Sequence, residues 1–254
     1  MSRAPDWLMA RPIAHRGLHD QAASRVENSI SAAKAALERR FAIECDVQLS
    51  ADGEAMVFHD FLLDRLTAQQ GAVASRTARE LAAVALTSSA DTVATLPDYL
   101  DLIAGRVPLV IEIKSRFDGD LRLARRVAEI LAGCASPVAI KSFDPDPIAF
   151  LQERRPMLGL TAVPLGIVAE ARYDEGEWRA LPPERRIELT NLLHFERTRP
   201  DFLSWRVDDL PHVAPHLFRA ALGLPVMTWT VRTPGQRALA ARWADQMVFE
   251  GFMP

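Results

Sequence analysis

Short apolar segments alternate with amphipathic helical segments along almost the whole chain, and this alternation most constrains the fold. Apolar runs bounded by turn residues predict strands, whereas apolar side chains recurring every three or four residues, as in 118–132, predict helices with one buried face. Strands that alternate with helices form parallel sheets. If the hairpin predicted at 41–59 is counted as one unit, there are eight strands. The predicted strands are residues 12–15, 41–49, 54–58, 108–114, 138–143, 157–163, 202–207, 226–231 and 246–249.

Eight such units predict a TIM (β/α)8 barrel, an α/β fold that typically takes about 250 residues as one domain. The chain has 254 residues, so we expect a single barrel domain over 1–254. The turn signal Asp52-Gly53 predicts a β-hairpin extension after strand 2. An open doubly wound sheet is the alternative, but no G-x-G-x-x-G turn follows a predicted strand. A looser segment is expected at 164–181, and helices are expected from Asn28 or Ser29 to about Arg40 and at 78–86, 96–105, 118–132, 146–154, 183–195, 211–222 and 234–243.

The composition argues against several classes of protein. The net charge is −3 and both signs are mixed along the chain, which argues against broad electrostatic binding to nucleic acid or an anionic membrane. Cys45 and Cys134 are the two cysteines, so no disulfide framework is expected. No apolar run approaches a membrane span, and residues 1–16 lack the apolar core of a signal peptide. We therefore expect a cytoplasmic protein without a transmembrane segment, and the oligomeric state stays open.

Two carboxylates lie in the strand predicted at 41–49. Glu44 and Asp46 are two residues apart, so both point to the same side of the strand. The apolar flanks indicate a buried strand, and two buried carboxylates would repel each other and be costly to desolvate. A bound cation would remove both problems, whereas an exposed strand face would need no ligand. These residues alone leave both interpretations open.

Polar residues recur where the predicted strands end. Active sites of TIM barrels lie at the carboxyl ends of the strands, so we expect these side chains to converge on one mouth. Gathering so many buried charges is costly unless they serve a ligand. The residues are His15 and Arg16 at the end of the first strand, Glu44 and Asp46 in the second with His59 on its hairpin, Glu112 and Lys114 in the third, Lys141 and Ser142 in the fourth, and Trp229 and Thr230 in the seventh.

The residue types in this set predict phosphodiester chemistry. Three carboxylates supply hard oxygen ligands, which suit Mg²⁺ or Ca²⁺ better than zinc. Arg16 and Lys114 suit a phosphate group, arginine as a planar fork and lysine as a point charge. His15 and His59 can divide the general base and general acid roles near neutral pH. A metal, phosphate-binding cations and two histidines together indicate cleavage of a phosphodiester.

Motifs in a fixed order carry a resemblance to a known family. The chain resembles the glycerophosphodiester phosphodiesterase family in residue type, spacing and order over nearly its whole length. The motifs are Ala14-His15-Arg16-Gly17, Glu27-Asn28-Ser29, Glu44-x-Asp46-Val47, Ser50-Ala51-Asp52-Gly53, Val57-Phe58-His59-Asp60, Leu63-x-Arg65-x-Thr67, Glu112-Ile113-Lys114, Ser142-Phe143-Asp144 and Trp229-Thr230-Val231.

The resemblance implies a metal-dependent hydrolase of lipid and glycerol metabolism on a TIM barrel. Such an enzyme would cleave glycerophosphodiesters, as its small-molecule substrates, to sn-glycerol 3-phosphate and an alcohol such as choline or ethanolamine. Carried over by motif, His15 and His59 would be the acid/base pair, and Arg16 and Lys114 would contact the phosphate. The implied ligands of one divalent cation, Mg²⁺ or Ca²⁺ with Mn²⁺ as a further option, are Glu44, Asp46 and Glu112, and further implied substrate contacts are Lys141 and Trp229.

The chain departs from the family pattern at positions expected on the far side of the mouth. Lys141 stands where a glutamine is expected before Ser-Phe, and Arg232 stands where the family has asparagine. Glu250 follows the last strand where the family usually has aspartate. Lys141 and Arg232 would favour an anionic leaving group, unless both are surface cations. These departures leave the substrate head group open.

Two other functions are the alternatives. A phosphodiesterase on the same barrel that acts on lysophospholipids or phosphoinositides would need an apolar rim to hold an acyl chain. A non-catalytic protein that binds a phosphate ligand would be expected to lack a histidine or a metal carboxylate, and all of these are present. The residues available for an apolar rim in the segment 164–181 are Leu165, Ile167, Val168, Tyr173 and Trp178.

Overall fold

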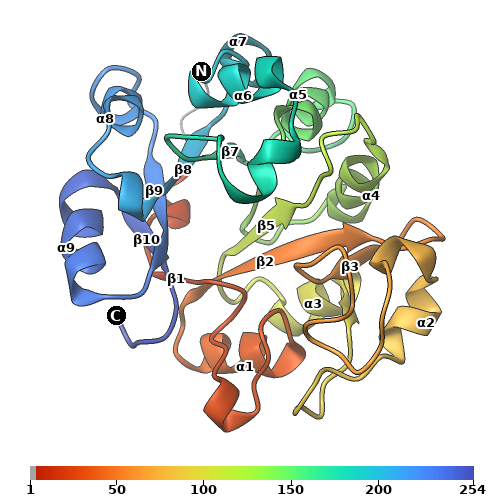
Figure 1. Ribbon diagram of the computed structural model, residues 1–254. Coiled ribbons are helices and arrows are strands. Elements are labelled where there is room, and N and C mark those ends of the chain that lie inside the picture. The colour runs from red at the N-terminus through yellow and green to blue at the C-terminus, as the bar shows by residue number, and fades with distance from the viewer. Residues whose placement is uncertain (1–3) are drawn as a thin grey trace.

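Parallel strands closed into a barrel form the centre of the molecule. The barrel strands are β1 (Ile13–Ala14), β2 (Ala42–Leu49), β5 (Leu109–Ile113), β6 (Val138–Ser142), β7 (Leu165–Ala169), β8 (Phe202–Arg206), β9 (Val226–Val231) and β10 (Gln246–Phe249). The computed structural model describes residues 4–254, and within them these eight strands follow the order β1-β10-β9-β8-β7-β6-β5-β2. Pairing of β1 with β2 closes the ring, and helices surround it (Figure 1). The predicted TIM barrel is confirmed.

The helices follow the predicted order, and most of them are shorter than predicted. They are α1 (Ile30–Glu38), α2 (Ala78–Ala82), α3 (Leu96–Ile103), α4 (Arg122–Leu131), α5 (Pro145–Arg154), α6 (Pro183–Thr190), α7 (Phe195–Thr198), α8 (Val213–Ala220) and α9 (Pro234–Trp243). The Ser29 hydroxyl caps α1 by accepting a hydrogen bond from the amide of Ala32. The helix predicted at 183–195 is divided into α6 and α7. Among residues 4–254, no helix has the length and apolar character needed to cross a bilayer.

One predicted strand is wrong. Residues 157–163 form turns and bends, and the strand that pairs with β6 and β8 is β7, within 164–181, where the sequence predicts a looser segment. Leu160 and Val163 are buried, so this segment is apolar because it packs against the core, although it forms no ladder. Apolar content in a short segment marks burial and does not by itself distinguish a strand from a buried turn.

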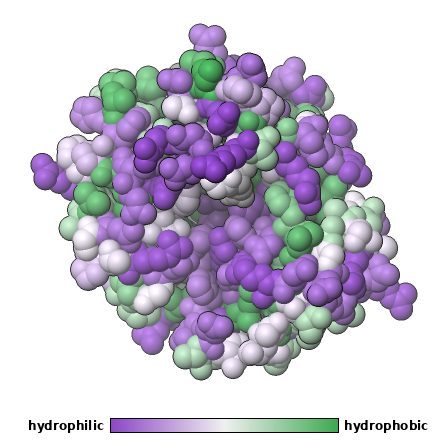
Figure 2. All heavy atoms as spheres, viewed as in Figure 1, coloured by the Kyte–Doolittle hydropathy of each residue, from purple (hydrophilic) through white to green (hydrophobic). Residues whose placement is uncertain are grey.

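Side chains of the barrel strands divide between two faces. Cys45 of β2 points outward into the apolar layer beneath the helices, as its position between two carboxylates predicts. Alternate residues point into the barrel, where Gly166 gives room to Phe202, since a Cβ at Gly166 would lie 2.3 Å from that ring. Apolar side chains fill one end of the interior, and the opposite end is hollowed (Figure 2). The apolar filling consists of Ala4, Leu8, Ile13, Ala42, Val110, Ala139, Phe202, Met227 and Val248.

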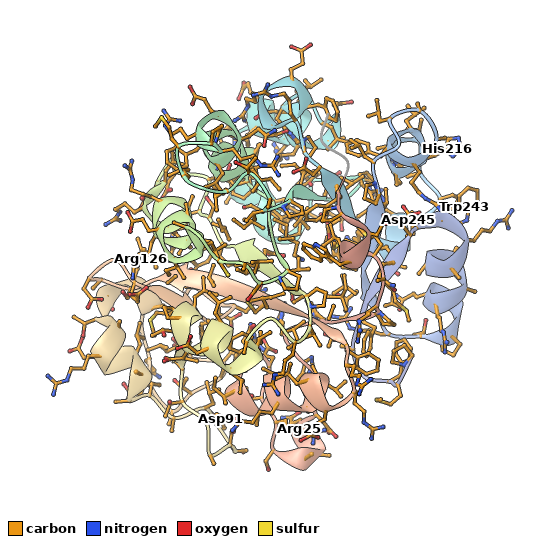
Figure 3. All side chains as sticks on the ribbon, turned by 180° about the vertical axis from the view of Figure 1, so that it is seen from behind. Arg25, Asp91, Arg126, His216, Trp243 and Asp245 are labelled. Atoms are coloured by element: carbon orange, nitrogen blue, oxygen red, sulfur yellow. The ribbon has the colours of Figure 1, made fainter. Side chains whose placement is uncertain are left out.

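The predicted hairpin extends the sheet beyond the barrel. β3 (Ala55–Val57) pairs antiparallel with the end of β2, and β4 (Ala94–Thr95) pairs antiparallel with β3. The chain reverses at Asp52-Gly53, where Gly53 has a positive φ of 87°. Arg126 of α4, on the outer layer of helices (Figure 3), donates to both carboxylate oxygens of Glu54 at 3.0 and 2.9 Å. This bidentate pair fastens the hairpin to the barrel.

Candidate active site

A cavity of about 1070 Å³ opens at the carboxyl ends of the barrel strands. It is the hollow at the centre of the face in Figure 2, where hydrophilic residues surround the opening. Glu44 alone of the predicted site residues does not line it, because that side chain is fully buried. The predicted residues that line the cavity are His15, Arg16, Asp46, His59, Glu112, Lys114, Lys141 and Trp229.

Glu44, Asp46 and Glu112 form a buried carboxylate cluster. One oxygen from each lies within 4.8 Å of those of the other two. Asp46 of β2 pairs with Glu112 of β5, so both side chains leave the same face of adjacent strands, and Glu44 lies one pleat below. An exposed strand face is excluded, since Glu44 and Asp46 are 0% and 1% exposed.

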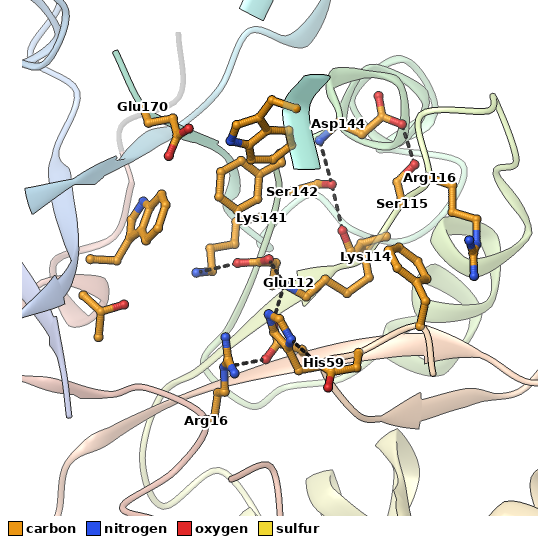
Figure 4. Close-up of a pocket in the computed structure, with 18 of the residues that line it drawn as sticks. Arg16, His59, Glu112, Lys114, Ser115, Arg116, Lys141, Ser142, Asp144 and Glu170 are labelled. Atoms are coloured by element: carbon orange, nitrogen blue, oxygen red, sulfur yellow. Dashed lines mark hydrogen bonds and ion pairs between the residues drawn. The ribbon is translucent and has the colours of Figure 1, made fainter. Parts of the chain in front are cut away.

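Two lysines pair with this carboxylate cluster (Figure 4). Lys114 Nζ lies 2.9 Å from Asp46 Oδ1 and 2.5 Å from Glu112 Oε1. Lys141 Nζ lies 3.1 Å from Glu44 Oε1 and 3.0 Å from Glu112 Oε2. Burial would raise the pKa of Glu112, but the two lysines hold that pKa at about 2. Burial would lower the pKa of each lysine, but the carboxylates raise both above the usual value, so both are ammonium ions.

The interpretation of Lys141 as a surface cation is wrong. The residue is 2% exposed, because the pairing of β6 with β5 sets it beside Glu112 inside the barrel. The side chain of Arg232 is 52% exposed, and its Nε lies 2.5 Å from Glu250 Oε1. Both cations already have carboxylate partners, so neither by itself favours an anionic leaving group.

Backbone conformation and carboxylates together hold Arg16 at the cavity. Arg16 and Gly17 have positive φ values of 56° and 79°, and a Cβ at Gly17 would lie 2.9 Å from the backbone of α1. The backbone amide of Arg16 donates to Glu44 Oε2 at 3.0 Å. Its guanidinium lies 3.3 Å from Asp46 Oδ2 and donates to Glu27 Oε1 at 2.6 Å. The His-Arg-Gly motif is therefore a tight turn that aims a guanidinium across the carboxylate cluster.

A chain of ion pairs links Arg16 to His59. Glu27 accepts hydrogen bonds from Arg16 and also from Arg65, at 2.7 Å from Arg65 Nη2. Arg65 Nε donates to Asp60 Oδ2 at 2.6 Å, and Asp60 Oδ1 lies 2.7 Å from His59 Nδ1. Burial would raise the pKa of Asp60, but His59 and Arg65 hold that pKa well below its usual range. The ionised Asp60 fixes the ring of His59 through Nδ1.

This chain of ion pairs predicts acid-sensitive stability. Burial would raise the pKa of Glu27, but Arg65 and Arg16 lower it to about 2 in the folded protein, against about 4.3 in an unfolded chain. Because the folded pKa is the lower one, ionised Glu27 stabilises the fold above about pH 4.3, and this contribution is lost as the pH falls toward 2. Its full value is about 3 kcal/mol.

Glu27→Gln should therefore flatten the decrease in the free energy of unfolding between pH 5 and pH 3, measured by urea titration. Glu153→Gln, at a side chain that is 71% exposed, controls for losing a surface carboxylate. The same steep decrease in Glu27→Gln as in the wild type would contradict the assignment.

Glu250 contacts the other predicted histidine. His15 Nδ1 lies 2.5 Å from Glu250 Oε2, and His19 Nε2 lies 3.5 Å from the same oxygen. Burial would raise the pKa of Glu250, but the hydrogen bonds with His15 and His19 hold that pKa well below its usual range. The sequence identifies Glu250 only as a departure from the family pattern. Its position directly after the last strand is the signal that it lies near the cavity.

Asn28 also contacts the site, which sequence reasoning missed. Its Nδ2 donates to Asp46 Oδ2 at 2.9 Å, and its Oδ1 accepts from the backbone amide of Asp46 at 3.2 Å. The sequence predicts Asn28 or Ser29 as a helix cap, and Ser29 takes that role. The motif Glu27-Asn28-Ser29 singles out Asn28 in the sequence, but it does not indicate that Asn28 contacts Asp46.

Aromatic side chains form one wall of the cavity. Trp229 packs edge to face on Phe143, with ring centroids 5.3 Å apart, and Phe143 packs on Trp178 at 5.1 Å. The Trp229 Nε1 donates to the carbonyl of Ser204 at 3.0 Å, which fixes the indole. Trp178 is the one residue considered for an apolar rim that lines the cavity. The others, Leu165, Ile167, Val168 and Tyr173, are buried.

The match to a family model covers almost the whole chain. The model of the glycerophosphoryl diester phosphodiesterase family matches residues 15–253. The chain belongs to this family. It is therefore a phosphoric diester hydrolase of the glycerophosphodiester class, and the resemblance carried by the motifs is confirmed. No curated protein sequence matches it.

Solved structures of phosphodiesterases share its fold. One is a phosphodiesterase from Oleispira antarctica in complex with the product sn-glycerol-3-phosphate, with 20% identity, a TM-score of 0.75, and coverage of 96% of this chain and 93% of that chain. Glycerophosphodiester phosphodiesterases from Thermotoga maritima (24% identity, TM-score 0.69, coverage 93% and 92%) and Parabacteroides distasonis (21%, 0.71, 94% and 92%) are also similar.

Proposed function

We propose that the chain hydrolyses glycerophosphodiesters with one divalent cation and two histidines. The observation that carries this proposal is the carboxylate cluster, which shares one cavity with His15, His59 and Arg16. The net reaction adds water across a P–O bond and yields sn-glycerol 3-phosphate and an alcohol. The product bound to the Oleispira antarctica relative supports the glycerol phosphate side of this reaction.

The carboxylate cluster is the proposed site of the cation. Glu44, Asp46 and Glu112 offer the oxygen ligands that Mg²⁺, Ca²⁺ and Mn²⁺ prefer. Glu44 Oε1 is buried and accepts no hydrogen bond from the described residues, and its charged partner is Lys141 Nζ at 3.1 Å. A bound cation would polarise a phosphate oxygen and stabilise the charge that develops there.

His15 and His59 are the proposed acid/base pair. Each has Nδ1 against a carboxylate, of Glu250 and Asp60 respectively, which orients the ring and leaves Nε2 for the substrate. One histidine takes the proton of a glycerol hydroxyl as that hydroxyl attacks phosphorus, and the other gives a proton to the leaving alcohol. Water then opens the cyclic phosphate with the two histidines in reversed roles.

Arg16 and Lys114 are the proposed phosphate contacts, because both cations line the cavity beside the carboxylate cluster. Lys141 and Trp229 are the proposed contacts on the leaving-group side. The aromatic wall that includes Trp229 supplies apolar area there, and exposed Arg116 supplies positive charge at the rim.

Metal removal is the first test. Protein stripped with EDTA should not release glycerol 3-phosphate from glycerophosphocholine or glycerophosphoethanolamine, and added Mg²⁺, Mn²⁺ or Ca²⁺ should restore release. No ion should restore release in Glu44→Ala, which lacks one proposed ligand. Undiminished release by the stripped protein would overturn metal dependence, and absence of release with every metal would overturn the choice of substrate.

The aromatic wall favours a second candidate, a phosphodiesterase for lysophospholipids. Phe61, Leu62 and Leu181 line the cavity together with the aromatic rings, and Leu62 is 50% exposed. Such a rim would hold part of an acyl chain. Release of choline from lysophosphatidylcholine faster than from glycerophosphocholine would favour this candidate.

The described strands all belong to one sheet, which supports the proposal that residues 1–254 act as a single domain. Cytoplasmic location stays a prediction from the sequence.

A further inference from the structure

Lysine is rare in this chain. Of 30 basic residues other than histidine, three are lysines, namely Lys34, Lys114 and Lys141. Lys34 is exposed in α1, whereas Lys114 and Lys141 both contact the carboxylate cluster. Arginine is the basic residue almost everywhere else, so two of the three lysine ammonium groups lie at the carboxylate cluster, the proposed site of the cation.

Lys141 reaches the carboxylate cluster from within the barrel wall. It leaves β6 beside Glu112 of β5, and Figure 4 shows its amine paired with Glu112. The distances are 3.1 Å to Glu44 Oε1 and 3.0 Å to Glu112 Oε2. These two residues supply two of the three proposed metal ligands, so the amine and a divalent cation draw on the same carboxylates.

The carboxylate cluster is also neutral in formal charge. Three carboxylates face three cations, which are Lys114, Lys141 and Arg16, and Arg16 is shared with Glu27 outside the cluster. Without Lys141 the sum would be −1, which attracts a divalent cation, and Glu44 would lose its lysine partner. The neutral amide of glutamine, expected here from the family pattern, would leave that negative charge in place.

We propose that Lys141 is a built-in competitor of the divalent cation: its ammonium neutralises Glu44 and Glu112 in the metal-free protein and weakens cation binding. This inference rests on the proposed cation site. Lysine suits the role because its charge sits at the end of a flexible four-carbon stem, so the amine can leave the carboxylates without moving the strand. The carboxylate cluster thus folds without metal, and the cation must displace the amine to bind.

Cation binding to the stripped protein tests this directly. Titration with Ca²⁺ and with Mn²⁺ by calorimetry should give a dissociation constant at least ten-fold lower for Lys141→Gln than for the wild type. Lys141→Met, which removes the charge but keeps an unbranched side chain, should show the same gain. Lys34→Gln, which removes an exposed lysine, should bind as the wild type does.

Thermal unfolding gives a second measurement on the same variants. Without metal, Lys141→Gln should melt below the wild type, because Glu44 and Glu112 lose a counter-charge. Added Ca²⁺ should raise its melting temperature more than that of the wild type, because a tighter ligand stabilises the folded state more. If Lys141→Gln does not fold without metal, recovery of a cooperative melt on adding Ca²⁺ supports the proposal, and no recovery contradicts it.

The possible failures are distinguishable. Equal or weaker cation binding by both Lys141 variants overturns the competitor role and leaves the proposed cation site standing. Absence of binding by every protein overturns both. Tighter binding by the variants, with no hydrolysis of glycerophosphodiesters by any protein, supports the competitor role and overturns the proposed function.

Discussion

His15→Ala and His59→Ala should each lower kcat/KM for glycerophosphodiesters by about 10²- to 10⁴-fold, the range that one general acid or base contributes. The fold should survive both changes. His59 is partly exposed, and the loss of His15 leaves Glu250 paired with Arg232 at 2.5 Å. Initial rates of glycerol 3-phosphate release would measure the activity, and circular dichroism with thermal unfolding would measure the fold.

A change of leaving group separates the roles of the two histidines. A glycerophosphodiester of p-nitrophenol has a leaving group that needs no proton, so the variant that lacks the general acid should regain most of its rate. The variant that lacks the base should not. His216→Ala is the matched control, because His216 is an exposed residue of α8 at the periphery (Figure 3). Activity near that of the wild type in either site variant would remove that histidine from the mechanism.

Asp46→Asn should cost both activity and stability. Asp46 is 1% exposed and pairs with Lys114 at 2.9 Å, Arg16 at 3.3 Å and Asn28 at 2.9 Å. The amide leaves two cations with less counter-charge, and breaking a buried pair costs about 3–5 kcal/mol. The free energy of unfolding in urea would measure this loss.

The same variant should lower kcat/KM by more than about 100-fold, the upper range for a residue that only orients a metal ligand. Asp101→Asn is the control, because it makes the same substitution at an exposed residue of α3. A stable Asp46→Asn variant with a normal rate would be incompatible with both the ligand role and the charge balance described above.

Periodicity predicted the barrel because each strand must bury one face against helices. It failed at 157–163 because both that segment and β7 pack against the core, and neither propensity nor apolar content separates them. Strand pairing distinguishes the two segments: Leu165 of β7 pairs with Ile140, and Gly166 of β7 pairs with Phe202. These are contacts between residues distant in the sequence.

The site was predictable as far as residue types and strand ends go. The position of each strand end predicted the mouth, and the residue types predicted the chemistry. The partners were not predictable in the same way: Lys141 cannot be distinguished from a surface cation until the register sets it beside Glu112. Likewise Glu250 follows the last strand, and only closure of the barrel brings it to His15. Charge pairing across a closed sheet depends on three-dimensional neighbours that one strand does not reveal.

The contact between His15 and Glu250 joins residues 235 positions apart, one after the first barrel strand and the other after the last. A polypeptide still emerging from the ribosome has no carboxylate to orient His15 until residue 250 has been made and β10 has docked between β1 and β9. Premature termination or proteolytic trimming before residue 250 would leave a molecule with every motif up to Trp229 intact and an unsupported histidine. The orientation of His15 therefore depends on β10, the barrel strand that is synthesised last.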